Sequence, residues 1–206
     1  STAAFRLSKG PVVDSWSTGG ALNTSRNGGG GVGIQTAALA FGGFVGASGT
    51  ITESYNGTSW TEVNDLNTGR HGGIGGAGTN TAGLAYGGFS LSVPGRVAVT
   101  ETWNGTNWTE VNDLNTARSS LAGCGTNTAA LAFGGTTGPA RVANNETWNG
   151  TSWTEVNDLN TARDSLAGAG TNTAALAFGG APMPSTSALT ELWNGTNWTE
   201  VNDLGT

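Results

Sequence analysis

The sequence predicts an all-β fold, a propeller built of four-stranded antiparallel blades, and three observations lead to this prediction. Residues 101–135 return as residues 146–180 with three differences, at positions 107/152, 119/164 and 124/169. Successive repeats are separated by 44, 48, 45 and 45 residues, by subtraction from Trp16, Trp60, Trp108, Trp153 and Trp198. A period near 45 is typical of propeller blades. Glycine makes up 36 of the 206 residues, and glycine, asparagine and threonine disfavour helix.

Each repeat divides into four short strands. In the third repeat, residues 120–125 and 128–133 are the expected strands a and b, and residues 101–103 and 107–111 are strands c and d of the preceding blade. Asn104-Gly105 between c and d predicts a two-residue type I′ hairpin, which pairs Glu101 with Trp108. Trp103 and Trp108 then lie diagonally on one face of the hairpin, where they pack blade against blade.

The expected domain is single and covers residues 1–206. Four blades are expected at residues 28–66, 71–114, 119–159 and 164–204. Residues 1–27 are left over and are interpreted as a partial blade, a closing arm or the edge of a longer array of repeats. Because these N-terminal residues do not make a complete blade, the sequence leaves open whether the ring closes with four blades, with five blades or by joining two chains. Self-association through the incomplete blade is one expectation, since repeat units need neighbours to bury their faces.

The repeat resembles the kelch repeat in four features: a Gly-Gly doublet after an apolar strand, then an aromatic residue, then a tryptophan, then an arginine that opens the next unit. They stand at Gly42-Gly43, Gly87-Gly88, Gly134-Gly135 and Gly179-Gly180; at Tyr55, Trp103, Trp148 and Trp193; at Trp60, Trp108, Trp153 and Trp198; and at Arg70, Arg118 and Arg163. The two aromatics are closer together than is usual for kelch units. The near-identity of neighbouring units is similar to the highly repetitive propellers of tailed-phage and bacterial proteins. That resemblance implies an extracellular or virion-associated protein.

Charge excludes one class of partner. The formal net charge is −6 with eight Lys and Arg, whereas recognition of a nucleic-acid backbone needs clustered basic residues. Twelve of the fourteen acids occupy three repeated positions. The acidity therefore belongs to the template, by which we mean the sequence pattern that the repeats share. The acidic balance leads us to expect no nucleic-acid binding. Because no apolar run is long enough to span a bilayer, we also expect no membrane insertion.

Signals for enzymatic chemistry are weak. One histidine and one cysteine give no metal cluster and no Cys–His nucleophile pair. Cys124 stands where the other repeats have Ala77 and Ala169, which predicts a small buried residue, and His71 is interpreted as a solvated loop histidine. The oxygen-rich Val-Asn-Asp-Leu-Asn-Thr segments fit turn chemistry better than a calcium loop. We therefore expect no enzyme activity, no metal and no cofactor.

Variation within the repeats marks the candidate ligand contacts. The loops between strands b and c, residues 136–145 and 181–190, differ at most positions although the surrounding template is nearly unchanged. A second variable position in the aligned repeats directly follows the repeated arginine. It is occupied by Asn27, His71, Ser119 and Asp164. By the kelch resemblance the b–c and d–a loops emerge on one face, around a ring of arginines. The candidate ligand-binding residues are Arg26, Asn27, Phe44, Arg70, His71, Phe89, Arg96, Arg118, Ser119, Arg141, Arg163, Asp164 and Met183.

Several interpretations of this pattern stay open. Function concentrates on loops that a rigid scaffold holds, but loops also drift faster than strands. The arginines either bind anionic groups or pair with Asp65, Asp113 and Asp158 of the preceding loops. We expect a non-enzymatic binding or display module that recognises carbohydrate or another cell-surface ligand. A purely structural virion or assembly module is the first alternative, a propeller enzyme with converging carboxylates the second, and a designed repeat protein the third.

Overall fold

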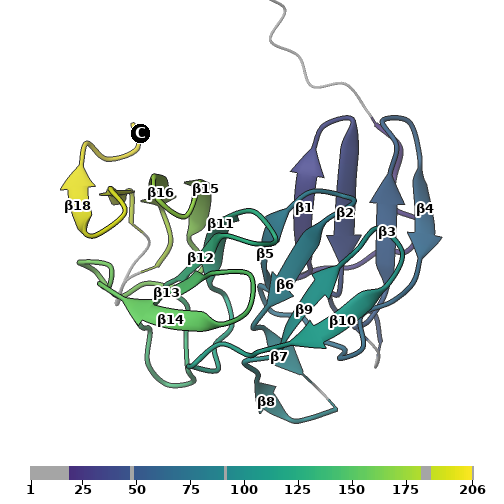
Figure 1. Cartoon of the computed structure of the whole chain (residues 1–206), viewed down its shortest axis with the longest axis horizontal. Helices are drawn as coiled ribbons and strands as arrows, with labels where there is room; N and C mark the ends of the chain where they lie inside the picture. Colours follow the sequence, from purple (N-terminus) through teal and green to yellow (C-terminus); the bar gives the residue numbers. More distant parts are fainter. Residues whose placement is uncertain (1–18, 47–48, 91, 182–186, 206) are drawn as a thin grey trace, which may run out of the picture.

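The structure is a computed structural model that describes residues 19–46, 49–90, 92–181 and 187–205. It is an all-β protein in which four four-stranded antiparallel sheets are arranged as a four-blade propeller (Figure 1). The predicted fold class is therefore confirmed. Over these residues there is no helix long and apolar enough to cross a membrane.

The four main strands of each blade follow one another in the chain. Blade 1 contains β1 (Gly30–Ile34), β2 (Ala37–Phe41), β3 (Thr52–Tyr55) and β4 (Trp60–Val63). Blade 2 contains β5 (Gly75–Gly78), β6 (Gly83–Tyr86), β9 (Thr100–Trp103) and β10 (Trp108–Val111), and its b–c loop carries the short hairpin β7 (Phe89–Ser90) and β8 (Gly95–Arg96). Blade 3 contains β11 (Ala122–Gly125), β12 (Ala130–Phe133), β13 (Asn145–Trp148) and β14 (Trp153–Val156). Blade 4 contains β15 (Ala167–Gly170), β16 (Ala175–Phe178), β17 (Thr190–Trp193) and β18 (Trp198–Val201).

The innermost strands are rich in glycine and alanine, and neighbouring blades approach closely there. Strands β1, β5, β11 and β15 contact one another in chain order. A Cβ atom built on Gly76 of β5 would lie 3.0 Å from Val32 Cγ1 and 3.1 Å from Phe41 Cζ, both in blade 1. A side chain at Gly76 would therefore push against the side chains of blade 1.

The aromatic residues pack blade against blade, as predicted. The strand-b aromatic of one blade meets the strand-d tryptophan of the next edge to face, with ring centroids 5.2, 4.9 and 5.0 Å apart in the pairs Phe41–Trp108, Tyr86–Trp153 and Phe133–Trp198. Such pairs add about 0.5–1.5 kcal/mol to the effect of burial alone. Each of the three blade interfaces therefore has the same aromatic centre.

The hairpin between strands c and d differs from the prediction. Trp103 lies directly opposite Trp108, and Glu101 lies opposite Glu110, so the loop has four residues and not two. Asn104 Oδ1 accepts the backbone N–H groups of Thr106 and Asn107 at 2.9 and 2.8 Å. The predicted type I′ register is wrong because Asn104 caps the turn through its side chain, with a positive φ at Gly105 alone. The two tryptophans do share one face, as expected.

One blade interface carries a polar mismatch. Trp108 and Trp153 donate their indole N–H to the hydroxyls of Thr52 and Thr100, each at 3.1 Å. At the third interface Asn145 stands in the threonine position, and Asn145 Oδ1 and Trp198 Nε1 are both buried without a hydrogen-bond partner. Unpaired buried polar atoms destabilise a fold.

Replacing Asn145 with threonine is therefore expected to stabilise the protein by about 1–2 kcal/mol, because the hydroxyl can accept the Trp198 N–H. Denaturant unfolding of the N145T variant measures the gain. The matched control is Asn144→Thr in the adjacent, less buried position, for which we expect a change within about 0.5 kcal/mol. A loss of stability in N145T would contradict the assignment.

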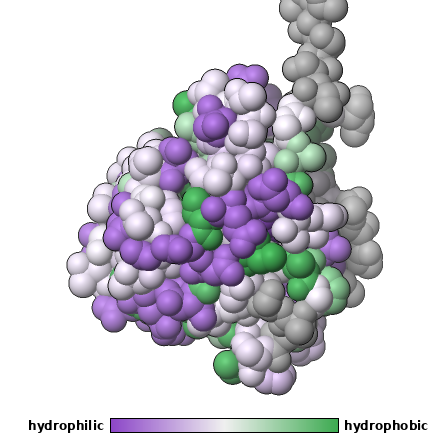
Figure 2. All heavy atoms as spheres, turned by 90° about the vertical axis from the view of Figure 1, so that its right-hand side faces the viewer, coloured by the Kyte–Doolittle hydropathy of each residue, from purple (hydrophilic) through white to green (hydrophobic). Residues whose placement is uncertain are grey.

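The outer strands make a hydrophilic rim. Thr109 and Glu110 of β10 are exposed, as are their counterparts in β4, β14 and β18. The side of the molecule that lies at the right in Figure 1 is accordingly mostly hydrophilic, with apolar patches between the polar residues (Figure 2).

The single cysteine is buried, as predicted. Cys124 is 7% exposed and its thiol points to the carbonyl of Thr171 at 3.6 Å. Burial raises the pKa of the Cys124 thiol to about 12, so the reactive thiolate is scarce at neutral pH. Cys124 is a packing residue.

The expected partial blade lies mostly outside the described residues, because Trp16 belongs to residues 1–18. The described part, residues 19–27, docks on blade 1. Asn23 and Thr24 donate their backbone N–H groups to Glu53 at 2.7 and 3.2 Å, and Trp60 Nε1 donates to the carbonyl of Gly20 at 3.1 Å. This segment has the hydrogen bonds of a d–a loop.

Candidate functional site

The repeated arginines are internal ion-pair partners. Arg70, Arg118 and Arg163 are fully buried. Their guanidinium groups contact Glu101, Glu146 and Glu191 at 3.1, 3.0 and 3.1 Å. Arg26 makes the same pair with Glu53. The expectation that these arginines pair with Asp65, Asp113 and Asp158 is therefore wrong about the partner, although it correctly proposed a structural bridge.

The pair of Arg70 and Glu101 shows how the bridge works. Glu101 in strand c of blade 2 accepts the backbone N–H groups of Asn67 and Thr68, which lie between the blades, at 2.8 and 3.3 Å. Arg70 also donates to the carbonyls of Ala85 and Gly87, both at 3.2 Å. Burial lowers the pKa of Arg70 to about 10, while the attraction of Glu101 opposes the shift. The guanidinium of Arg70 is surrounded by protein atoms and is not exposed to solvent. The repeated arginines are therefore not available to bind a ligand on the surface.

The repeated aspartates close the other side of each loop. The Oδ1 atoms of Asp65, Asp113 and Asp158 accept the backbone N–H at the start of strand c, from Thr52, Thr100 and Asn145, each at 3.1 Å. A buried glutamate and an aspartate per repeat therefore serve the fold, as the repeated acids were expected to do.

The two variable columns of the sequence meet on one face. The residue after each repeated arginine forms a β-bridge with the first residue of the b–c loop, in the pairs Asn27–Phe44, His71–Phe89, Ser119–Thr136 and Asp164–Ala181. The His71–Phe89 bridge has both hydrogen bonds, at 2.8 and 2.7 Å. Because the d–a and b–c loops are joined in this way in every blade, the variable residues that follow the repeated arginines lie at the same ends of the blades as the described starts of the b–c loops.

An aromatic and cationic strip crosses this face. His71 lies between Phe44 and Phe89, with ring centroids 5.4 Å apart in each pair. The guanidinium of Arg96 lies 5.9 Å from the centre of the Phe89 ring. Phe44 is 48% exposed, and the other three are half-buried. We call these four residues the loop strip.

The loop strip continues toward blades 3 and 4. Arg96 of the second b–c loop reaches the carbonyl of Gly138 in the third at 3.5 Å. Arg141 of the third loop pairs with Asp164 at the start of blade 4, with 3.2 Å between Nε and Oδ1. Loops of successive blades therefore contact each other through their variable residues.

The remaining candidate residues are placed differently. Asn27 is exposed and Ser119 is buried, so Ser119 is held inside its β-bridge. Met183 lies outside the described residues. His71 differs from the expected solvated histidine, because its Nε2 atom is buried without a hydrogen-bond partner.

Sequence reasoning missed two kinds of residue. The strand-c glutamates were recognised as template residues but not as partners of the arginines. The equal repetition of both residues was the available signal. The second kind is an exposed apolar side chain in a b–c loop. Val93, at the tip of the second b–c loop, is 64% exposed, and its place in a Ser-Val-Pro-Gly turn was the signal that could have predicted this exposure.

No group of three or more histidine, cysteine or acidic side chains within the described part of the chain is arranged to hold a metal ion. Comparison with models of known protein families found no match, and a search of curated proteins found none either. The function therefore has to be argued from the loop strip itself.

Proposed function

We propose that the protein is a non-enzymatic binding or display module that recognises carbohydrate or another cell-surface ligand through the b–c loop face. The observation that carries the proposal is the loop strip, in which the residues that vary between near-identical repeats contact one another across the blades. The scaffold beneath it repeats the same strands and Arg–Glu pairs in every blade, so variation at the strip can change ligand contacts without changing the fold.

The chemistry of the strip fits a ligand with both apolar faces and polar groups. Phe44 offers an exposed ring, Arg96 offers a guanidinium over the Phe89 ring, and Arg141 offers a second guanidinium in the third b–c loop. Aromatic residues and arginine are the side chains that most often dominate binding energy. Sugars present C–H faces together with hydroxyl groups, which this combination suits.

The kelch resemblance and an extracellular or virion-associated location are part of the same proposal. Support comes from the Gly-Gly doublets, the paired aromatics and the repeated arginines, each of which has a defined place in the blade. Fold alone does not fix function, so the binding face has to be tested directly.

The test is a glycan and bacterial-surface binding screen on the parent chain, followed by variants. We expect the parent to bind, Phe44→Ala to bind about tenfold more weakly or worse, and a variant with all four b–c loops replaced by a short Gly-Ser loop to lose binding. Thr106→Ala, in an exposed c–d turn away from the loop face, is the control that should bind like the parent. Absence of binding by the folded parent, or binding retained after loop replacement, would contradict the proposal.

A purely structural module is the second candidate, and one specific observation favours it. The outward face of blade 4 exposes Leu176, whose counterparts are buried in the other blades, and Leu192, which stands where those blades have serine or threonine; the two side chains are 38% and 43% exposed. An apolar face of this kind is suited to assembly.

A further inference from the structure

The faces of the first and last blades are the two halves of an interface that the chain forms three times internally. Each internal interface joins the trailing face of one blade, the side toward the next blade in the chain, to the leading face of that next blade. Strand-b leucines and aromatics supply the trailing face, and strand-a glycines and strand-d tryptophans supply the leading face. Among the described residues, no following blade covers the trailing face of blade 4, and no preceding blade covers the leading face of blade 1, where residues 19–27 bind Glu53 and Trp60.

Blade 4 is exposed where its counterparts are buried. Leu176 is 38% exposed, whereas Leu39, Leu84 and Leu131 at the same template position are 0–1% exposed. Leu204 is 48% exposed, whereas Leu66, Leu114 and Leu159 are 3–4% exposed. Both leucines belong to positions that the next blade covers elsewhere in the chain.

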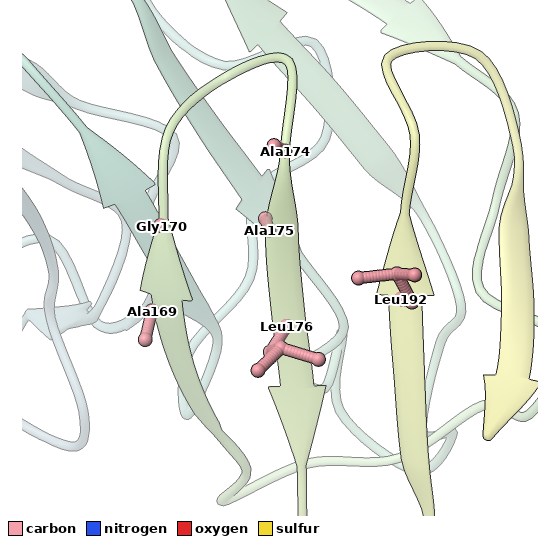
Figure 3. Close-up of a pocket in the computed structure, with 6 residues that line it drawn as sticks. All are labelled: Ala169, Gly170, Ala174, Ala175, Leu176 and Leu192. Carbon is pink, nitrogen blue, oxygen red and sulfur yellow. The ribbon is translucent and has the colours of Figure 1, made fainter.

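The free face of blade 4 is more apolar than the template. Leu192 stands opposite Leu176, at a position occupied by Ser54, Thr102 and Thr147 in the other blades. Leu176 and Leu192 lie next to Ala169 around a hollow of about 320 Å³ that residues of blade 4 alone line (Figure 3). A blade face that stays in water is expected to be polar, whereas Leu176 and Leu192 make this face of blade 4 apolar.

Blade 1 keeps the features that receive such a face. At the internal interfaces, glycine is required in strand a because an aromatic ring of the preceding blade occupies the space: Phe41 at Gly76, Tyr86 at Gly123 and Phe133 at Gly168. Gly31 holds this position in blade 1, yet a Cβ atom there meets nothing nearer than the Leu39 carbonyl oxygen at 3.4 Å. Trp60 holds the position of Trp108, Trp153 and Trp198, but within the described part of the chain the aromatic ring against it is Tyr55 of its own blade, at 4.9 Å between ring centroids. A second hollow, lined by Gly31, Val32, Ala38, Trp60 and neighbouring residues of blade 1, marks the same place.

We propose that a second copy of this chain covers the free face of blade 4, with Phe178 of one copy seated over Gly31 and against Trp60 of the next. The contact repeats the three internal interfaces in register, which is the reason for choosing a second copy as the occupant. It is a head-to-tail contact, so it closes into a ring or propagates according to the rotation between copies. It uses neither the loop strip nor its proposed ligand.

The test is sedimentation equilibrium over a wide range of protein concentration, against the single-chain mass of 20.6 kDa. The parent is expected to reach a multiple of this mass. Gly31→Lys blocks the leading face and Leu176→Lys blocks the trailing face, so each variant alone is expected to keep the single-chain mass. An equal mixture should form a two-chain complex and nothing larger, because each variant retains the face that the other lacks.

Controls separate this contact from other causes. Val93→Lys changes an equally apolar exposed side chain on a b–c loop, and Phe44→Ala changes the loop strip; both should associate like the parent. Leu192→Thr restores the template residue of blades 2 and 3 and is expected to weaken association even if a lysine variant misfolds. A single-chain mass for the parent at every concentration would overturn the proposal, as would association of either lysine variant alone or failure of the mixture to pair.

Discussion

Glu101→Gln is expected to lower the free energy of unfolding by about 3–5 kcal/mol, the usual consequence of breaking a buried ion pair. The Glu101 carboxylate accepts hydrogen bonds from Arg70, from Asn67 and from the backbone N–H of Thr68, and it has no exposed surface. A glutamine amide has one acceptor oxygen, and its NH₂ group faces donors. The Arg70 charge would then be buried without a counter-charge.

Urea or guanidinium unfolding of the variant, followed by tryptophan fluorescence, measures this loss. The matched control is Glu110→Gln. Glu110 is directly opposite Glu101 in the hairpin but is exposed, so we expect a change within about 0.5 kcal/mol. Equal effects of the two substitutions would show that the Arg70–Glu101 pair does not hold the blades together.

Gly123→Ala is expected to destabilise the protein by about 2–3 kcal/mol, in the range of overpacked cores. The added methyl group would overlap the hydroxyl of Tyr86 and the carbonyl oxygen of Leu131. Tyr86 is fully buried, and its hydroxyl donates to the Leu131 carbonyl at 3.1 Å. The ring must therefore shift away from Trp153 and lose that hydrogen bond.

The control uses the same template position in another blade. Gly31→Ala places its methyl group in ordinary van der Waals contact with the Leu39 carbonyl oxygen, at 3.4 Å, so we expect no loss and a gain of up to about 0.5–1 kcal/mol from the lower backbone entropy of alanine in the unfolded chain. Thermal and denaturant unfolding at a concentration where the protein is a single copy compares the two variants. Similar destabilisation by both would contradict the blade packing.

The local chemistry of the repeat was sufficient to predict much of the fold. Four strands per unit, the Gly-Gly ends of strand b and the aromatic contacts between blades all follow from a pattern that repeats at each blade. Cys124 was placed correctly because its counterparts Ala77 and Ala169 show the size of the site. These inferences succeeded because they depend on residues a few positions apart, or on the same position in neighbouring repeats.

Partners distant in the sequence were harder to assign. Arg70 has an aspartate nearby in the chain and a glutamate 31 residues away, and both sequence positions repeat equally well. The structure selects Glu101 because strand c brings it beneath the loop, where the backbone N–H groups of Asn67 and Thr68 converge. The hairpin register failed for a related reason: the Asn104 side chain, and not the turn backbone, fixes the loop length.

The candidate face was also only partly predictable. Sequence variation identified Phe44, His71, Phe89 and Arg96 one at a time, and the kelch resemblance implied that they share a side of the disc. Their contact with one another depends on the β-bridge that joins each d–a loop to a b–c loop, which no local pattern reports.

The sequence by itself determined the blade, its period and its all-β character, because strand pairing and turn chemistry act over short distances. Tertiary structure decided which charges are buried, which variable residues touch, and which blade faces the other described blades cover. Those properties depend on how blades stack. At Gly31 and Gly123 the same residue meets a carbonyl oxygen of its own blade in one case and a buried ring of the preceding blade in the other.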